Sequence, residues 1–240
     1  MSPKKEKKTK RNAGKVSITP DHRIIKVIET RNEETSSWRI FKIIGEFVSG
    51  YEFLKNYPLS ASIFGTSRRG FEDEIYKEAQ KLGYKLATAG FAVITGGGPG
   101  VMEAANRGAY NAGGKSVGIN IQLPVEQKTN PYVKESIAVN HFFIRKLMLS
   151  FAAEVYIFFP GGFGTLDEFF ELITLIQTKK SKPIPIILIN KEYWSPLLGW
   201  IENQVYKKNH AIDKEDLDIY HLVDTADEAF ELIQNLADIK

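Results

Sequence analysis

From residue 60 onward, short apolar runs alternate with longer amphipathic segments, and this alternation constrains the fold more than any other feature. The apolar runs predict strands at 61–64, 91–95, 117–121, 137–139, 155–159 and 184–189. The amphipathic segments predict helices at 71–89, 101–111, 143–153, 166–177, 194–206 and 226–236. Short buried strands separated by helices pair in parallel, and helices cover both faces of such a sheet. The sequence therefore predicts a Rossmann-like, doubly wound α/β domain with a mostly parallel sheet.

The N-terminal part of the chain has a different character. Residues 1–15 contain seven lysine or arginine side chains and one glutamate, a net charge of +6. The whole chain has a net charge of +3, so the remaining residues together carry −3 and are mildly acidic. Between Trp38 and Leu54, apolar side chains three or four residues apart predict an amphipathic helix with an aromatic-rich face. We expect a basic disordered tail at 1–17, an N-terminal extension at 18–57 that contains this helix, and the α/β domain at 58–240.

Composition excludes several classes of protein. The chain has no cysteine, which rules out disulfide bonds, cysteine-bound zinc and thiol nucleophiles. No apolar run reaches the ~20 residues that span a bilayer, and the lysine-rich start lacks the apolar core of a signal peptide. We expect a cytoplasmic protein with no membrane partner. The lysine cluster could contact nucleic acid, but without interleaved aromatic residues a solubilising terminus is the favoured interpretation.

Three glycine-containing turns, at 65–70, 96–100 and 161–164, follow predicted strands. In a doubly wound sheet such turns lie together beyond the carboxyl ends of the strands, where ligands bind. Glycine lets the backbone approach a ligand, and the N-terminus of the next helix presents unpaired N–H groups that suit a phosphate. Arg68 and Arg69 could add positive charge. The convergence of the three turns therefore predicts a phosphate-bearing ligand.

Two carboxylates, Asp167 and Glu168, follow the third turn. Acids in a first helical turn also complement the helix dipole, so position alone leaves their purpose open. NAD is disfavoured, because Glu103 stands where the dinucleotide pattern G-x-G-x-x-G requires its last glycine. His141 has no serine partner or metal ligands at useful spacing, so we interpret it as structural and expect no metal site.

Two motifs carry a resemblance to a known family. The segments GGGPGVMEAAN at 96–106 and PGGFGTLDE at 160–168 resemble, in this order and spacing, the motifs of the LONELY GUY (LOG) family, which older usage labels "lysine decarboxylase-like". The pair Arg145-Lys146 is similar to the arginine–lysine pair that precedes the second motif in the family. The resemblance covers about residues 58–210, and leaves out the basic tail and the helix at 38–54.

The resemblance implies hydrolysis of the N-glycosidic bond of a purine or cytokinin nucleoside 5′-monophosphate, such as AMP, to free base and ribose 5-phosphate. It implies that Arg145 and Glu168 are the catalytic pair. It further implies that the substrate is bound by Gly65, Thr66, Ser67, Gly97, Gly98, Gly100, Glu103, Lys146, Gly161, Gly162, Gly164 and Thr165. No cofactor is expected, because the sequence offers no evident Schiff-base lysine for the pyridoxal enzyme that the older label suggests. Family members form homodimers or larger homo-oligomers.

The residue types suit this chemistry. Glycosidic cleavage passes through an oxocarbenium-like state, which a carboxylate near the sugar can stabilise while it activates water. Glu168 is the acid we expect to do so, whereas Asp167 is assigned to the helix start. Arg145 could orient Glu168, hold the nucleotide, or both. Two alternatives stay open: a non-catalytic nucleotide-binding sensor or carrier on the same fold, and a nucleic-acid or surface-binding protein that acts through its basic tail.

Overall fold

The structure, a computed structural model, describes residues 37–68, 74–122 and 129–237. The expected basic tail, Arg69 and the start of the helix predicted at 71–89 lie outside the described residues. The chain divides into two units, 1–42 and 43–240, and the second holds the whole α/β fold. Helix α2 (Ser37–Leu54) confirms the predicted amphipathic helix.

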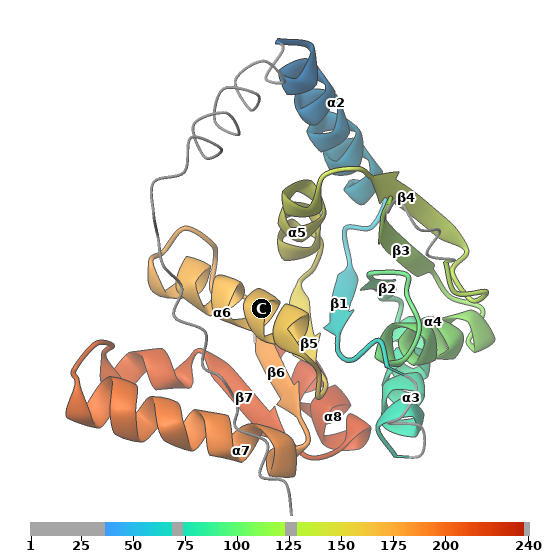
Figure 1. Cartoon of the computed structure of the whole chain (residues 1–240). Coiled ribbons are helices and arrows are strands. Elements are labelled where there is room, and N and C mark those ends of the chain that lie inside the picture. The colour runs from blue at the N-terminus through green and yellow to red at the C-terminus, as the bar shows by residue number, and fades with distance from the viewer. Residues whose placement is uncertain (1–36, 69–73, 123–128, 238–240) are drawn as a thin grey trace, which may run out of the picture. The chain divides into compact units, whose positions relative to one another are not determined.

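Seven strands form one sheet in the order β4-β3-β2-β1-β5-β6-β7, and every neighbouring pair is parallel (Figure 1). The strands are β1 (Ser60–Phe64), β2 (Ala92–Thr95), β3 (Ser116–Ile121), β4 (Glu135–Val139), β5 (Val155–Phe158), β6 (Ile186–Ile189) and β7 (Tyr220–Val223). The central strands β1, β2, β5 and β6 are buried along their whole length, as the continuous apolar runs predicted. This sheet confirms the predicted fold class.

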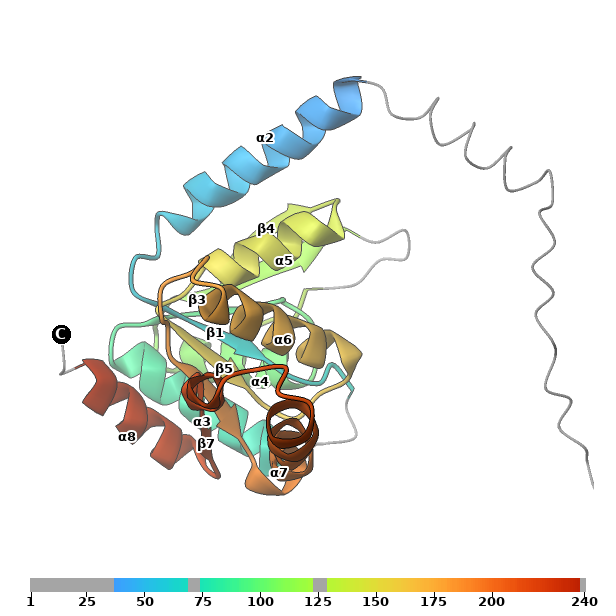
Figure 2. The same cartoon turned by 90° about the vertical axis from the view of Figure 1, so that its left-hand side faces the viewer.

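Helices cover both faces of the sheet. They are α3 (Glu74–Thr88), α4 (Val101–Asn111), α5 (Phe142–Phe151), α6 (Phe163–Gln177), α7 (Lys191–Trp200), which continues as the π-helix η2 (Ile201–Lys208), the 3₁₀-helix η3 (Lys214–Asp218) and α8 (Ala226–Ala237). One apolar core contains side chains of α5, α6 and α7, and the other contains side chains of α3, α4 and α8. Figure 2 shows α5 and α6 on one side of the sheet and α3 and α8 on the other. Adjacent residues of β1 point to opposite cores, Ile63 to the second and Phe64 to the first.

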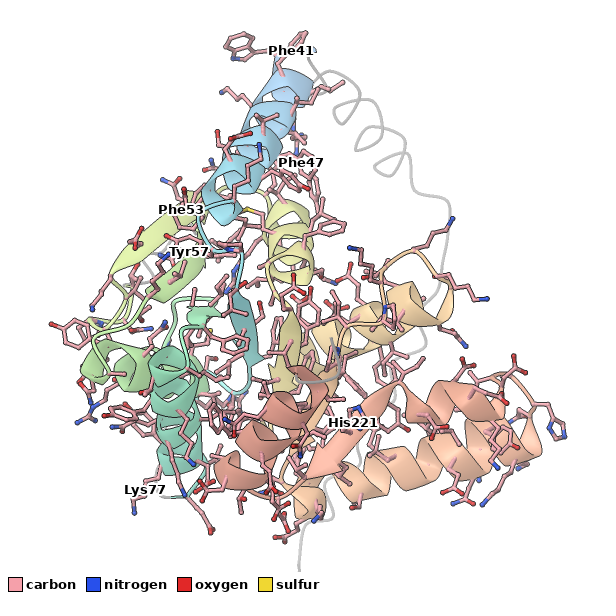
Figure 3. All side chains as sticks on the ribbon, turned by 180° about the vertical axis from the view of Figure 1, so that it is seen from behind. Phe41, Phe47, Phe53, Tyr57, Lys77 and His221 are labelled. Carbon is pink, nitrogen blue, oxygen red and sulfur yellow. The ribbon has the colours of Figure 1, made fainter. Side chains whose placement is uncertain are left out.

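Several elements differ from the sequence prediction, among them one whole strand and the starts of another strand and of a helix. Strand β7 was not predicted, because its residues are all half-buried and include His221, labelled in Figure 3, so no continuous apolar run marks it. Strand β6 begins at Ile186 rather than at 184, since Pro185 has no N–H to donate to a ladder. Helix α6 begins at Phe163, three residues before the predicted start. The last difference changes the functional site, because it moves Phe163, Gly164 and Thr165 into the first helical turn.

The strand order reverses between β1 and β5. From β1 the chain adds β2, β3 and β4 toward one edge, and it then returns to place β5 on the other side of β1. In doubly wound sheets a crevice opens at this reversal, beyond the carboxyl ends of the strands, and ligands bind in it. The turns after β1 and β5 lie at this point, and the turn after β2 is next to them.

Helices α3 and α4 pack against each other through glycine. A Cβ atom on Gly83 would lie 2.3 Å from the carbonyl oxygen of Ala105, and one on Gly108 would lie 2.0 Å from the carbonyl oxygen of Gln80. Backbone atoms cannot move aside as the end of a side chain can. We expect Gly83→Ala to separate the two helices and to lower the free energy of unfolding by about 1–3 kcal/mol in a urea titration.

The control for this prediction is Gly45→Ala in helix α2, where an added Cβ meets nothing within 4 Å among the described residues. Alanine is the better helix former, so this variant should be unchanged or more stable by about 0.5–1 kcal/mol. Equal unfolding free energies for the two variants would contradict the packing argument.

Candidate functional site

The three glycine turns meet, as predicted. In the turn after β1, the Thr66 N–H donates to the Pro160 carbonyl at 3.0 Å, and the Thr66 carbonyl accepts from the Val101 N–H at 3.0 Å. Gly100 has a φ of +73°, and a Cβ on it would lie 2.3 Å from the Thr66 carbonyl oxygen. A residue with a side chain is therefore excluded where the first turn crosses the second. Each turn supports its neighbour, so the three form one continuous surface.

The N-terminus of α6 is built to receive an anion. Its N-cap, Gly162, makes no side-chain capping bond, and the first intrahelical bond runs from the Leu166 N–H to the Gly162 carbonyl at 3.1 Å. The N–H groups of residues 163–165 therefore have no partner within the helix. From α7, the Tyr193 hydroxyl donates to the Gly161 carbonyl at 2.6 Å and steadies the turn. These N–H groups, with the positive end of the helix dipole, match the oxygens of a phosphate.

A cavity of about 660 Å³ opens over this surface, a size typical of small-ligand sites. The predicted site residues that line it are Gly65, Thr66, Ser67, Gly161, Gly162, Gly164, Thr165, Arg145 and Glu168. Arg68, considered as an extra positive charge, also lines it. Sequence reasoning did not single out Gly96, Met102, Phe142 and Phe163, which line it as well. Phe163 is 92% exposed, and the motif PGGFGT was the one signal that could have pointed to it.

Other predicted residues lie outside the cavity lining. Gly97 and Gly98 hold the turn after β2 in place, because their carbonyls accept from the main-chain N–H and the side-chain amide of Asn130 at 2.9 and 3.0 Å. Gly100 packs on Thr66. Glu103 is half-buried, and it interacts electrostatically with Tyr76 and Arg107. These residues shape the turns rather than face the cavity.

Arg145, from helix α5, is held by main-chain carbonyls. Its Nε donates to the Ile119 carbonyl at 2.9 Å and its Nη2 donates to the Gly96 carbonyl at 3.1 Å. A Cβ on Gly96 would lie 2.0 Å from Nη2, so only glycine leaves room for this arginine. Burial lowers the pKa of Arg145, and the nearby Glu168 opposes that change. Among the described residues no ion pair joins Arg145 to Glu168 and no acceptor meets its remaining N–H groups, which leaves them for a ligand.

Glu168, from helix α6, is a buried carboxyl group. It is 8% exposed, and its Oε2 has no hydrogen-bond partner among the described residues. Burial raises its pKa to about 7; Glu171 and Asp167 raise it as well, while Lys146 and Arg145 act in the opposite direction. A carboxyl group that changes charge near neutral pH is suited to proton transfer. Glu168 and Arg145 thus meet in one cavity from two different helices.

The Lys146 side chain, from helix α5, forms ion pairs with two acids of helix α6. Its Nζ lies 2.6 Å from Asp167 Oδ2 and 3.1 Å from Glu171 Oε2, and its side chain is 18% exposed. The helix-start role expected for Asp167 is wrong, because α6 begins at Phe163 and has no acid in its first turn. Asp167 instead joins Lys146 in tying α6 to α5, next to Glu168.

We expect stability to depend on pH through Glu168. Its pKa is about 7 in the folded chain and 4.5 as the ordinary value, so between these pH values the folded chain binds the extra proton. The stabilising contribution of this group to the free energy of unfolding, on the order of 3 kcal/mol, is therefore fully present below pH 4.5. It is lost as the pH rises through 7. In urea titrations, Glu168→Gln should gain stability relative to the unmodified chain between pH 5 and pH 8.

Asp167→Asn provides the matched control for this titration, because it removes a neighbouring carboxylate that is 55% exposed. Its stability relative to the unmodified chain should change far less over the same pH range. Parallel pH curves for the unmodified chain and Glu168→Gln would show that the buried carboxyl group does not titrate in this range.

Among the described residues, no three histidine, aspartate or glutamate side chains gather closely enough to hold a metal ion. Within the same ranges, no helix is both long and apolar enough to cross a membrane. The described lining of the cavity includes two arginines and no lysine.

A family model described as "Possible lysine decarboxylase" matches residues 102–233. A probable cytokinin riboside 5′-monophosphate phosphoribohydrolase of Oryza sativa is 31% identical over 149 residues, which are 60% of this chain and 60% of that protein. A cytokinin riboside 5′-monophosphate phosphoribohydrolase of Arabidopsis thaliana is 30% identical over 167 residues, 68% of this chain and 76% of that protein. The chain thus spans 60% of the first relative and 76% of the second.

Among solved structures, the molybdenum cofactor carrier protein of Chlamydomonas reinhardtii superposes with a TM-score of 0.56 at 19% identity, over 75% of this chain and 98% of that one. At this identity the likeness shows the fold alone.

Proposed function

The chain belongs to the LONELY GUY family, and from this premise we propose that it hydrolyses the N-glycosidic bond of a nucleoside 5′-monophosphate, releasing the free base and ribose 5-phosphate. The observation that carries the proposal is the shared cavity. One wall is the unpaired N-terminus of α6, which suits a phosphate, and the same cavity contains a buried carboxyl group, Glu168, and a fixed guanidinium, Arg145. The reaction needs a site for the phosphate of the nucleotide, a carboxylate near the ribose and a cation that holds the substrate.

The phosphate would bind at the N–H groups of Phe163, Gly164 and Thr165, with the Thr66, Ser67 and Thr165 hydroxyls within the same lining. Glu168 lies one turn further along α6, so a phosphate fixed at the helix end brings the ribose to the carboxylate. The phosphate thereby acts as a handle that orients C1′, which lowers the entropic part of the barrier.

The reaction then proceeds by addition of water to C1′. As the bond from C1′ to the base nitrogen breaks, its electron pair moves to the base and positive charge develops on the ribose ring. The Glu168 carboxylate stabilises that charge and accepts the proton of the attacking water, whose oxygen bonds to C1′. The departing base nitrogen takes up a proton from solvent and Glu168 returns its proton to solvent, so one water is consumed for each free base and ribose 5-phosphate released. Arg145 uses the N–H groups that the protein leaves free to hold the nucleotide, and the two backbone carbonyls prevent it from swinging onto Glu168.

The base would lie against the apolar part of the lining, which includes Met102, Phe142 and Leu149. A purine, or the N6-modified adenine of a cytokinin as in the names of the relatives, fits such a surface. The label "possible lysine decarboxylase" finds no support there, since a pyridoxal enzyme needs a lysine for its Schiff base and the described lining contains none.

A carrier function is the second candidate, because the solved structure named above is a molybdenum cofactor carrier. That likeness is one of fold. The buried, unpartnered carboxyl of Glu168 favours the enzyme, since a carrier of anionic ligands gains nothing from an acid in its cavity.

The proposal is tested with a panel of nucleoside monophosphates, the corresponding nucleosides, and lysine, followed by chromatography for free base and cadaverine. We expect base from AMP or an N6-modified AMP, little from the nucleosides because they lack the phosphate handle, and no cadaverine. Binding of nucleotide without release of base from any of them would favour the carrier.

The homodimer or larger assembly and the cytoplasmic location expected from the sequence stay proposals. Helix α2 would suit a subunit interface, because it exposes apolar side chains that include Ile44, Phe47 and Tyr51. Light scattering of the full chain would measure the subunit number.

A further inference from the structure

Helix α2 provides a carboxylate to the start of helix α5. Glu46 accepts hydrogen bonds from the Asn140 side-chain amide at 2.6 Å, from the Asn140 N–H at 3.2 Å and from the His141 N–H at 3.3 Å. Its Oε2 also lies 3.0 Å from His141 Nδ1. The Glu46 side chain is 17% exposed, and burial works against its charge, yet the bonds from Asn140 and His141 lower its pKa. The hydrogen bonds from Asn140 and His141 therefore stabilise the charged form of Glu46.

These bonds hold the two residues at which helix α5 begins. His141 is the N-cap of α5 and makes no capping bond with its own side chain. The His141 carbonyl accepts from the Ile144 N–H at 3.1 Å and from the Arg145 N–H at 3.2 Å. A continuous set of hydrogen bonds thus leads from Glu46 through His141 to the backbone of Arg145, whose guanidinium is bonded to the Ile119 and Gly96 carbonyls.

The two helices touch again beyond the arginine. A Cβ on Gly50 would lie 2.5 Å from the sulfur of Met148, a side chain that is 3% exposed. Helix α5 is therefore held by α2 on both sides of Arg145, at Asn140 and His141 before it and at Met148 after it.

We propose that Glu46 is a positioning residue of the active site, which fixes Arg145 over the ends of β2 and β3 by holding the start of α5. The proposal rests on the proposed function. Glu46 precedes both residues 102–233, which the family model matches, and about residues 58–210, which the resemblance to the family covers. Part of the N-terminal extension therefore belongs to the catalytic unit.

The test compares Glu46→Gln with Glu52→Gln in the full chain. Glutamine keeps the shape of Glu46 but places an N–H₂ group against several donors. Glu52 is on the same helix and is 62% exposed, and within the described part of the chain it pairs only with Lys55. The control therefore makes the same chemical change without touching α5. Both variants are assayed with AMP at a temperature at which circular dichroism shows them fully folded.

We expect Glu46→Gln to lower kcat about tenfold or more with a smaller change in KM, because small misplacements of a catalytic group are costly. Glu52→Gln should match the unmodified chain. A role confined to stability would lower the melting temperature and leave kcat and KM of the folded variant unchanged. A kcat of Glu46→Gln within twofold of that of the unmodified chain would overturn the proposal.

If the unmodified chain releases no base from any nucleotide, the proposed function fails and the role of Glu46 is decided by calorimetric binding of AMP. Weaker binding by Glu46→Gln than by Glu52→Gln would then support the positioning role. Equal affinities would overturn it.

Discussion

Replacement of Glu168 by glutamine should lower kcat for base release by about 10³-fold or more, while nucleotide binding stays nearly unchanged. Glutamine keeps the size of the side chain, but it cannot accept a proton from water or place a negative charge beside the developing cation. The phosphate site at the start of α6 is untouched by this change, so the nucleotide still binds. Steady-state kinetics with AMP and calorimetric titration measure the two quantities separately.

The fold should tolerate this change, because the glutamate is buried at a cost that its raised pKa reflects. Asp167→Asn is the matched control, since it alters the adjacent residue, whose side chain is half exposed and bonded to Lys146. We expect the control to keep kcat within a few-fold of the unmodified chain. Normal turnover in Glu168→Gln would refute the role assigned to this residue.

Arg145→Met should lower kcat/KM by about 10–10⁴-fold, the range expected when one or two charge-assisted hydrogen bonds of about 1.5–3 kcal/mol each are lost. Methionine fills most of the same volume without a charge. The change also leaves the Ile119 and Gly96 carbonyls without their donor, so we expect a lower melting temperature. Assays of kcat/KM with AMP must therefore be made well below that temperature.

Arg145→Lys separates charge from geometry. A lysine keeps the positive charge but lacks the planar fork that reaches two carbonyls and a ligand together, so it should recover only part of the activity. Arg107→Met serves as the control, because Arg107 lies over the Tyr132 ring and does not line the cavity. If Arg145→Met and Arg107→Met had the same kcat/KM, Arg145 would have no special part in the reaction.

The sequence predicted the sheet and the meeting of its turns because both follow from local signals. Buried parallel strands need continuous apolar runs, and glycine must stand where one turn crosses another, as Gly100 does at Thr66. The half-buried edge strand β7 gives no such run. The start of α6 was misplaced because the glycines at 162 and 164 indicate a turn, although glycine is also compatible with an N-cap and a first helical turn.

The parts of the site that could not be predicted depend on contacts between distant residues. Lys146 was grouped with the substrate-binding residues because it matches the arginine–lysine pair of the family. That match does not indicate that its ammonium forms ion pairs with two acids on the next helix. Glu46 and His141 lie 95 positions apart, and no pattern in either segment indicates that they pair. The fixed position of Arg145 required Gly96, which only the folded arrangement reveals.

The two hydrogen bonds from Arg145 to the Ile119 and Gly96 carbonyls have a consequence for ligand selectivity. Carbonyl oxygens carry partial charges, so they hold the guanidinium without neutralising it, whereas a carboxylate partner would cancel most of its field. Among the described residues no carboxylate is bonded to Arg145, so a ligand that binds this guanidinium near the positive end of α6 displaces no internal anion. Such a cavity ranks ligands by their own negative charge, so a dianionic phosphate ester has an advantage over a neutral nucleoside before the base makes any contact.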